Sequence, residues 1–511
     1  SDTHSFPTRR SSDLAVARQT GSEVVVPPDP GLVGALGIGL LALRELAPDS
    51  ADEIDLERFL EARLLERDSF VCMSTKGCGG SGNRCRIDRI RTEVAGEAQR
   101  FVWGGACSLY ERGTGRRKLP DRCPDPFRAR EEMVREIVDA LGRRRGRPTV
   151  AMTDEFVLKG MFPFFATFFH ELGFDPVVET GAGHPVLKRG IEESNVPFCA
   201  PMQLYHGVVA ELAARQPDYL FLPRMRDLPR VQLEPRSYSC PIAQGSPDLL
   251  RWDVSPGSST RVLDPVVRID EGNLDSRELK RTCAELARSL GVRGRGWIGA
   301  LRRARRAQER FDARCLELGR EALGFCREND LLAVVVLGRP YTIHNTVLNS
   351  NVPAILREQG ALPIPVDCYP VPDDVPVLED LYWGHGQRTL RAATHVRSQP
   401  GVYSLLCSNY SCGPDSFTSN FYAFGHEGKP FALIETDGHA GDAGTKTRVE
   451  AFLYCARQDQ ESRRDRGPGR SLARIERAKR WVSDMRDSGD TVLVPRLTDG
   501  AEVLAACLQG L

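Results

Sequence analysis

The segment that most clearly decides the fold is Leu331-Leu-Ala-Val-Val-Val-Leu337, an apolar run without polar alternation. Such a run is typical of a strand buried on both faces, as in a parallel sheet covered by helices. The loop Gly338-Arg-Pro-Tyr341 follows it, and Val352–Glu358 is expected to be a helix that stops before Gly360. This part of the chain therefore predicts an α/β fold.

Similar strand-and-helix patterns extend outward in two runs, at about 148–250 and 331–455. Short apolar strands that alternate with helices predict two Rossmann-like domains with parallel sheets. We expect further strands at Thr149–Met152, Asp175–Glu179, Tyr219–Leu222, Val402–Cys407, Pro430–Glu435 and Thr491–Val494. We expect further helices at Phe162–Leu172, Met202–Arg215, Leu378–Ser398, Arg448–Arg457 and Ala501–Leu508.

Composition excludes several classes of protein. The 511 residues include 69 basic and 69 acidic side chains, and this balance argues against a nucleic-acid or anionic-membrane binder. No apolar run reaches the roughly 18 residues that span a bilayer, and no secretory signal is recognisable. We therefore expect a cytoplasmic protein, in which the 15 cysteines are thiols or metal ligands and not disulfides.

A first group of cysteines has the spacing Cys72-x5-Cys78-x6-Cys85-x21-Cys107, among glycines and arginines. Four thiolates at short spacing can surround a metal, and ligation would stabilise a segment with little apolar material. Spacing alone does not separate zinc from an iron–sulfur cluster, and four unrelated thiols are the alternative. We predict a metal site in residues 71–125.

A second group is dispersed: Cys199, Cys240 and Cys412 each stand before an expected helix, with a proline within the next two residues. Helix N-termini favour thiolate over thiol, and turns between strands and helices collect ligands in α/β folds. Buried packing thiols are the alternative reading of these three. That alternative is preferred for the cysteines on plain helical stretches, which are Cys283, Cys315, Cys326, Cys455 and Cys507.

Polar residues also crowd a loop after a strand, where Asp437, His439 and Arg448 are the candidates for contact with a substrate or partner. A capped, hydrogen-bonded turn is the alternative there. Arg339, directly after the strongest strand, could bind an anion or pair with a carboxylate.

Four strings resemble the 2-hydroxyacyl-CoA dehydratase and CoA-activase superfamily, and in particular its large fused activase-related proteins. They are Val335-Val-Leu-Gly-Arg-Pro-Tyr341, Tyr382-Trp-Gly-His-Gly-Gln387, Cys412-Gly-Pro-Asp-Ser-Phe417, and Asp437-Gly-His439 continuing to Thr447-Arg-Val-Glu-Ala-Phe452. In addition, Val24-Val-Val-Pro-Pro28 through Gly34-Ala-Leu-Gly37 resembles the end of the activase ATPase domain, which has an actin/Hsp70-like fold.

The resemblance implies an oxygen-sensitive iron–sulfur cluster, of 4Fe-4S or double-cubane type, held between the lobes by Cys199, Cys240 and Cys412. It also implies ATP-driven transfer of a low-potential electron to a substrate or a partner reductase. Cys72, Cys78, Cys85 and Cys107 would hold a second cluster or zinc, and Asp437, His439 and Arg448 would shape the catalytic pocket. An acyl-CoA is a candidate substrate.

This sequence departs from the family pattern in one respect, because it contains no Gly-rich phosphate loop and no Asp-bearing ATP site. ATP binding would then belong to an upstream part. The organisation expected along the chain is 1–13 an adapter-derived segment, 14–49 the remnant of the ATPase domain, 50–70 a linker of helical pattern, 71–125 the Cys-rich segment, 126–270 a Rossmann-like domain, 271–330 a helical connector and 331–511 a Rossmann-like, dehydratase-like domain.

Two other functions stay open at this stage. One is a 2-hydroxyacyl-CoA dehydratase that acts directly on a CoA thioester, and the other is a zinc-stabilised scaffold without catalysis. The oligomeric state is also open, with a homodimer as one option.

Overall fold

The computed structural model describes residues 34–35, 37–39, 505–506 and most of 63–462. Within 63–462 the described part leaves out 75–83, 95, 106–109, 111–118, 143–145, 195, 197, 232–233, 252–258, 427 and 437–442. The chain divides into two compact units, 1–69 with 88–102 and 70–87 with 103–511. Of the expected last helix, only 505–506 are described, and they are helical. The expected strand Thr491–Val494 and the expected segment 1–13 lie outside the described residues.

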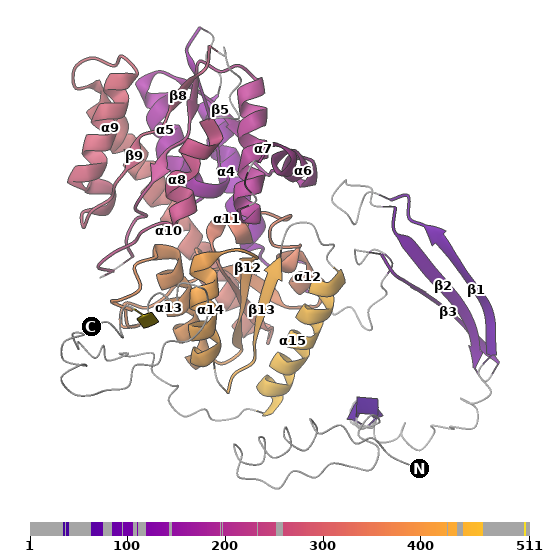
Figure 1. Cartoon of the computed structure of the whole chain (residues 1–511). Helices are drawn as coiled ribbons and strands as arrows, with labels where there is room; N and C mark the ends of the chain where they lie inside the picture. The colour runs from indigo at the N-terminus through magenta and orange to yellow at the C-terminus, as the bar shows by residue number, and fades with distance from the viewer. Residues whose placement is uncertain are drawn as a thin grey trace. The chain divides into compact units, whose positions relative to one another are not determined.

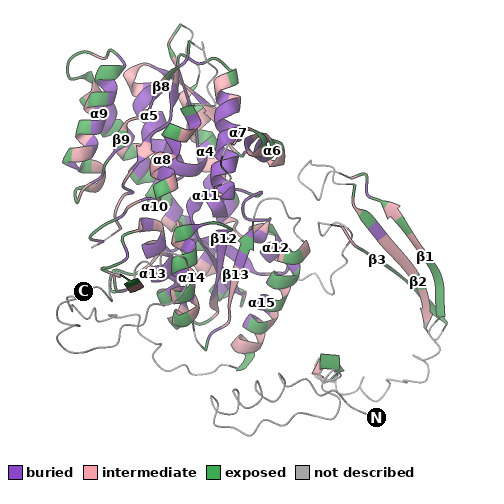
Figure 2. Ribbon diagram, viewed as in Figure 1, coloured by how far each residue is buried: buried purple, intermediate pink, exposed green. Residues whose placement is uncertain are grey.

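A three-stranded sheet contains β1 (Arg63–Val71), β2 (Arg86–Val94) and β3 (Glu97–Trp103), in the order β1-β2-β3 (Figure 1). Most residues of β1 and β3 are exposed, and exposed residues are green in Figure 2. The helical pattern expected up to residue 70 is corrected here, because 63–70 are extended. Pairing with β2 overrides local propensity, and Arg89 Nε donates to Asp68 Oδ1 at 2.6 Å.

Two parallel sheets form the centre of the second unit, consistent with the expected Rossmann-like domains. The first sheet has the order β5-β4-β6-β8 and the second the order β11-β10-β12-β13, so both place the first strand between the second and the third. Their strands are β4 (Thr149–Thr153), β5 (Asp175–Glu179), β6 (Tyr219–Phe221), β8 (Arg261–Leu263), β10 (Ala333–Leu337), β11 (Leu362–Pro365), β12 (Val402–Asn409) and β13 (Phe431–Thr436).

Helices accompany the strands of each sheet. We call the sheet β5-β4-β6-β8 with its helices the first lobe, and the sheet β11-β10-β12-β13 with its helices the second lobe. The first lobe contains α4 (Pro126–Leu141), α5 (Phe162–Leu172), α6 (His184–Glu193), α7 (Ala200–Ala214) and α8 (Pro241–Leu250), the turn η4 (Phe156–Leu158), and the small pair β7 (Arg224–Met225) and β9 (Val266–Val267). The connector holds η6 (Asn273–Asp275), α9 (Arg277–Ser289) and the long α10 (Gly296–Glu328). The second lobe contains α11 (Pro340–Ile343), α12 (Val352–Glu358), α13 (Gly384–Ser398), α14 (Gly413–Gly425) and α15 (Ala443–Ser462).

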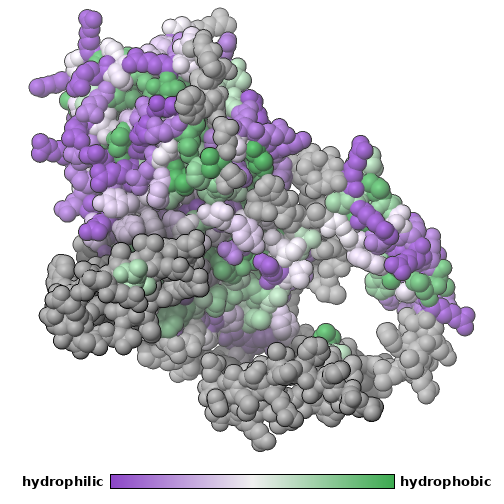
Figure 3. All heavy atoms as spheres, in the orientation of Figure 1, coloured by the Kyte–Doolittle hydropathy of each residue, from purple (hydrophilic) through white to green (hydrophobic). Residues whose placement is uncertain are grey.

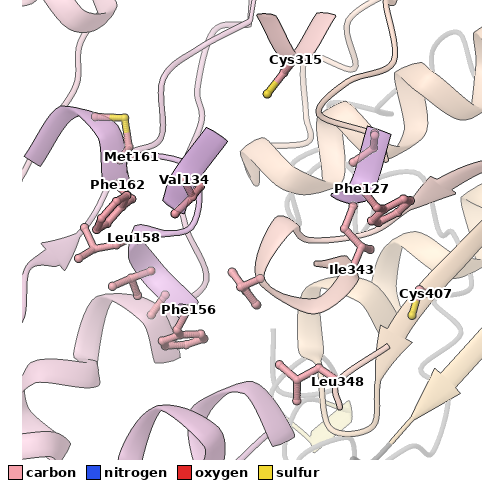
Figure 4. Close-up of a cluster of buried hydrophobic side chains, with 14 of the residues drawn as sticks. Phe127, Val134, Phe156, Leu158, Met161, Phe162, Cys315, Ile343, Leu348 and Cys407 are labelled. Atoms are coloured by element: carbon pink, nitrogen blue, oxygen red, sulfur yellow. The ribbon is translucent and has the colours of Figure 1, made fainter. Parts of the chain in front are cut away.

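One hydrophobic core joins the two lobes. Figure 4 shows part of it, with Phe156 and Leu158 of η4 in the first lobe and Ile343, Leu348 and Cys407 in the second. Helix α4 contacts α5 of the first lobe and β11 of the second, and α10 contacts both α5 and β10. The lobes therefore share a continuous apolar interior and are held as one compact unit.

Helices α6 and α7 pack with unusually close backbones. A Cβ added at Gly190 would lie 1.8 Å from the carbonyl oxygen of Gln203, and one at Gly207 would lie 2.0 Å from that of Val186. Only glycine fits at both positions, and this packing fixes the start of α7 relative to the rest of the first lobe.

Strand β11 and helix α13 are two of the elements that differ from the sequence-based expectation. Strand β11 was missed because Pro363 and Pro365 interrupt its pattern, yet it is an edge strand, where prolines are tolerated. Helix α13 begins at Gly384 and not at Leu378. The side chain of Gln387 accepts from the backbone N–H of Leu378 at 2.9 Å and donates to its carbonyl at 2.6 Å, which stabilises a loop before the helix.

No helix in the described part of the chain is long and apolar enough to cross a bilayer. On the face shown in Figure 3, hydrophilic side chains are interspersed with smaller hydrophobic areas over the described surface.

Candidate functional site

Each of the three dispersed cysteines is the residue that caps a helix. Cys199 precedes α7, Cys240 precedes α8 and Cys412 precedes α14. The backbone N–H of Ala243 donates to Cys240 Sγ at 3.3 Å, and that of Asp415 donates to Cys412 Sγ at 3.4 Å. The predicted position at helix N-termini is therefore confirmed, and the positive end of the helix dipole lies beside each sulfur.

These cysteines meet around the loop that follows β10. Burial raises the pKa of the Tyr341 hydroxyl well above its usual value, Arg339 acts in the opposite direction, and the three cysteines lie close enough to raise it further. Cys199 also lies close enough to Cys240 and Cys412 for their thiols to interact. The fold therefore brings together three residues from two lobes that are far apart in the sequence.

Sheet topology explains this location. Strand β10 lies between β11 and β12. The connection from β10 to β11 therefore runs to one side of β10, and the connection from β11 to β12 crosses back to its other side. Ligands of open parallel sheets bind at such a switch point, outside the carboxyl ends of the strands. Arg339 follows β10 and Cys412 follows β12, which places both at this point.

The site is largely shielded from water. Cys199 and Cys412 are buried, and Cys240 is half-buried. Burial raises the pKa of the Cys199 and Cys412 thiols, although the nearby Arg339 acts in the opposite direction. Any metal bound by these residues would have to displace thiol protons.

Arg339 is the buried cation of the site, with 4% of its surface exposed. Its Nη2 lies 2.9 Å from Asp415 Oδ2, and its Nη1 donates to the Tyr341 hydroxyl at 3.4 Å. The sequence left open whether Arg339 meets an anion or a carboxylate. The carboxylate of Asp415 is its partner, and the thiols of Cys199 and Cys412 lie nearby.

Aromatic rings border the site. The rings of Tyr238 and Tyr382 are 6.3 Å apart, those of Tyr382 and Trp383 are 4.9 Å apart, and those of Trp383 and Phe417 are 5.8 Å apart. They connect the segment before Cys240 to the helix after Cys412. The backbone N–H of Tyr238 donates to the Tyr382 carbonyl at 2.8 Å, which ties the first lobe to the second beside the thiols.

His385 faces the same region from the first turn of α13. Its ring lies 5.9 Å from that of Tyr341 in an edge-on arrangement. Burial lowers the pKa of His385 well below its usual value, and the cations of Arg388 and Arg339 lower it further. The imidazole is therefore neutral at physiological pH.

Cys199, Cys240 and Cys412 are sulfur donors of the kind that an iron–sulfur cluster takes. Among the described residues, no three His, Cys, Asp or Glu side chains form a group that could hold one ion. The ligands of a cluster bind different irons and need not converge on one point. Three soft sulfur donors, backbone N–H groups directed at two of the sulfurs and a buried cation suit a cluster.

The N-terminal cysteines are only partly described. Cys72 and Cys85 lie on adjacent strand ends, where the backbone N–H of Cys72 donates to the carbonyl of Cys85 at 2.8 Å. A Cβ added at Gly105 would lie 3.4 Å from the Cβ of Cys85, so the chain shortly before Cys107 also reaches this place. Cys78 and Cys107 lie outside the described residues, and the metal site stays a prediction.

The candidate pocket residues are likewise untested. Asp437 and His439 lie outside the described residues, and Arg448 is exposed on α15. Among the cysteines assigned to packing, Cys283, Cys315 and Cys326 are buried in helices and Cys455 is exposed. Cys507 lies outside the described residues.

A second polar cluster lies at the other end of the loop after β10, and we call it the charge cluster. It consists of Arg130, Glu131, Asp154, Glu155, Lys159, His344 and Asp367. Lys159 Nζ lies 3.0 Å from both Glu131 Oε2 and Asp154 Oδ2. Asp367 accepts from Arg130 Nε at 3.2 Å and lies 3.0 Å from His344 Nε2.

Within the charge cluster, Glu155 connects the two lobes. Its Oε1 accepts from the backbone N–H of Gly181 at 3.1 Å, from that of Ala182 at 3.3 Å and from Asn345 Nδ2 at 3.3 Å. Its Oε2 is buried without a hydrogen-bond partner. Burial raises the pKa of Glu155 to about 7, and Asp154 and Glu131 add to this effect.

Sequence reasoning named Arg339 only as a possible partner of an anion or a carboxylate, and it did not select Tyr341, Asp415 or His385 as site residues. A local signal existed for three of them, since Arg339 and Tyr341 directly follow the strongest strand and Asp415 lies in the first turn after Cys412. For His385 the only signal was its place between two glycines in Trp383-Gly-His-Gly386.

Comparison with known families supports the resemblance to CoA activases. Residues 149–369 match a family model described as a CoA enzyme activase uncharacterised domain. This range includes Cys199, Cys240, Arg339 and Tyr341, and it ends before Cys412. No curated protein matches the chain.

Among solved structures, the C-terminal domain of glucosamine-fructose-6-phosphate aminotransferase from Francisella tularensis is similar at 11% identity, with a TM-score of 0.18. The match covers 66% of this chain and 95% of that one. At this TM-score the similarity carries no argument about fold or function.

Proposed function

We propose that this chain is an iron–sulfur redox protein of the 2-hydroxyacyl-CoA dehydratase and CoA-activase superfamily. It would take part in ATP-driven transfer of low-potential electrons to a substrate or a partner reductase. The observation that carries the proposal is the meeting of three helix-capping cysteines around Arg339 and Tyr341. The match of residues 149–369 to a CoA enzyme activase uncharacterised domain supports the superfamily part of the proposal.

Cys199, Cys240 and Cys412 would hold the cluster through their thiolates, and a bound cluster supplies one-electron transfer at low potential. The N–H groups of Ala243 and Asp415 donate to two of the sulfurs and so stabilise negative charge there. Hydrogen bonds to sulfur and exclusion of water are the usual means of tuning such a site. Cys240 is the most exposed ligand, so electrons would enter or leave on its side.

The other parts of the proposal rest on the family resemblance. Cys72, Cys78, Cys85 and Cys107 would bind a second cluster or zinc. Asp437, His439 and Arg448 would shape the neighbouring pocket, and an acyl-CoA is the candidate substrate. ATP would be hydrolysed by an ATPase module, and the protein would work in the cytoplasm.

The test is the iron, zinc and acid-labile sulfide content of protein purified without oxygen, with visible spectra before and after dithionite. We expect iron with matching sulfide and a brown colour that bleaches on reduction. Cys412→Ala should lose iron and sulfide relative to the parent. Cys407→Ala is the matched control, because Cys407 is a buried thiol on β12 near Asp415 but does not cap a helix, and it should keep the parent content.

Full iron and sulfide in Cys412→Ala would contradict the assignment of the ligands. Zinc without sulfide or colour would contradict the redox function and would favour a zinc-stabilised scaffold.

A further inference from the structure

The buried guanidinium of Arg339 is placed by the backbone at the end of β10. Gly338 has a φ of +136°, and a Cβ at this position would lie 2.4 Å from the carbonyl oxygen of Cys407. The chain therefore leaves β10 in contact with β12, in a conformation that favours glycine. Arg339 follows this turn and caps α11, so its position is fixed by the sheet and not by a flexible loop.

Arg339 has one carboxylate partner and unused hydrogen-bonding capacity. Its Nη2 lies 2.9 Å from Asp415 Oδ2, but neither Nη2 nor Nε forms a hydrogen bond of good geometry. Its guanidinium carbon lies 5.2 Å from the centre of the Tyr341 ring. A buried arginine normally has its N–H groups satisfied, so this arrangement is suited to additional negative charge nearby.

Asp415 is the opposing charge. It lies in the first turn of α14, and its Oδ2 accepts from Ser408 Oγ at 2.6 Å. Its backbone N–H donates to Cys412 Sγ. The same residue therefore holds the cation with its side chain and contacts a thiol with its backbone.

We infer that Arg339 and Asp415 form an opposed pair of positioning residues that sets the reduction potential of the group held by Cys199, Cys240 and Cys412. The inference rests on the proposed function for the nature of that group. The positive charge of Arg339 stabilises added negative charge at the thiols, and the negative charge of Asp415 reduces that stabilisation. Because both side chains are buried, neither charge is screened as it would be on the surface.

The consequence follows from the charge balance of reduction. One electron enters from the external donor, no bond is made or broken, and the site gains one negative charge. A nearby cation stabilises the reduced form, and a nearby carboxylate destabilises it. Removing Arg339 should therefore make the potential more negative, and neutralising Asp415 should make it less negative.

The experiment is a spectroscopic redox titration of the full chain, purified without oxygen, in four variants. Arg339→Gln should shift the potential to a more negative value, and Asp415→Asn should shift it to a less negative value. Arg339→Lys keeps the charge and should stay nearer to the parent than Arg339→Gln does. Arg303→Gln removes an exposed arginine that pairs with Glu171 and should leave the potential unchanged.

Iron content and thermal melting are measured on the same samples. Opposite shifts at parental iron content support the inference, because a merely structural defect would not reverse sign between the two variants. Parental potentials in both variants, or shifts of the same sign, would overturn it while leaving the cluster in place. If Arg339→Gln does not fold, Asp415→Asn decides: a less negative potential at parental iron content supports the inference, and an unchanged or more negative potential overturns it. A parent protein without any cluster would overturn the proposed function and this inference together.

Discussion

The thiol site (Cys199, Cys240 and Cys412 with the pair Arg339–Asp415) and the charge cluster lie at opposite ends of the short helix α11, and their chemistry differs. Arg339 precedes the helix beside the thiols, and His344 follows it within the charge cluster. The charge cluster contains both signs of charge in mutual contact, with Lys159 and Arg130 paired with the three carboxylates of Glu131, Asp154 and Asp367. The thiol site contains one ion pair and three groups that are neutral until they lose a proton.

We therefore expect the charge cluster to serve stability and the three thiols to serve function. Charges that satisfy one another inside a protein hold elements together, and removing one leaves the others uncompensated. Thiols at helix N-termini beside a cation have no such internal partners, and removing one costs the fold little. We therefore expect changes in the charge cluster to reduce stability without removing iron from the folded protein, and replacement of one of the three cysteines to remove iron with little loss of stability.

The largest effect on stability should come from Lys159→Met. The side chain of Lys159 is 2% exposed, and its loss leaves Asp154 and Glu131 with too little compensation. We expect the free energy of unfolding to fall by about 3–5 kcal/mol, as for other broken buried pairs. Chemical denaturation measures this, and iron per folded molecule should stay at the parent level.

Lys188→Met is the matched control, because Lys188 is 80% exposed and its pair with Glu192 spans 4.0 Å. Its effect should stay within about 0.5 kcal/mol. Equal stability of the two variants would show that the charge cluster is not structural.

A smaller, pH-dependent effect is expected from Glu155→Gln. The folded-state pKa of about 7 lies above the ordinary 4.5, so the folded chain holds more protons than the unfolded chain between these values. The contribution of Glu155 to stability is therefore full below about pH 4.5 and is lost as pH rises through 7. Glutamine keeps an oxygen that accepts from the N–H groups of Gly181 and Ala182. Because glutamine does not ionise, its contribution to stability does not fall as pH rises.

We expect Glu155→Gln to be more stable than the parent at pH 8, by up to about 3 kcal/mol, and not at pH 5. Denaturation curves at both values measure the difference. Glu192→Gln, on the exposed face of α6, should show no such dependence. An unchanged pH profile in Glu155→Gln would mean that Glu155 is ionised in the fold at neutral pH.

The smallest effect on stability should come from Cys240→Ser in metal-free protein. Cys240 is half-buried, and a serine hydroxyl can accept from the N–H of Ala243 as the sulfur does. We expect a change below about 1 kcal/mol in the free energy of unfolding, together with loss of iron from the anaerobic preparation. A large loss of stability without metal would assign Cys240 to packing and remove the contrast between the two regions.

The sequence allowed the fold class and most strands of the two parallel sheets to be predicted, because apolar runs such as Leu331–Leu337 indicate burial on both faces. Helices Phe162–Leu172 and Val352–Glu358 have the predicted bounds, since a glycine marks the end of each pattern. Strand β11 was missed because its prolines signal a turn when the edge position is unknown.

The candidate site was predictable only in its local parts. A cysteine before a proline-containing first turn could be recognised as a helix cap at all three positions. That the three caps meet depends on the order of the strands, which no local pattern reveals. The charge cluster was not predicted at all, because Arg130, Asp154, Lys159 and Asp367 are read as surface charges until tertiary contacts bring them together.

The thiol site takes its cysteines from both lobes, and this has a further consequence for the connectivity of the chain. Cys240 belongs to the first lobe and Cys412 to the second, and they lie 172 positions apart in the sequence (412 − 240). A group bound by both would close that length of chain into a loop, as a covalent cross-link does. Such closure removes conformational entropy from the unfolded chain, and the gain grows slowly with loop length. Binding of such a group should therefore make the two lobes unfold more cooperatively, even if no helix moves.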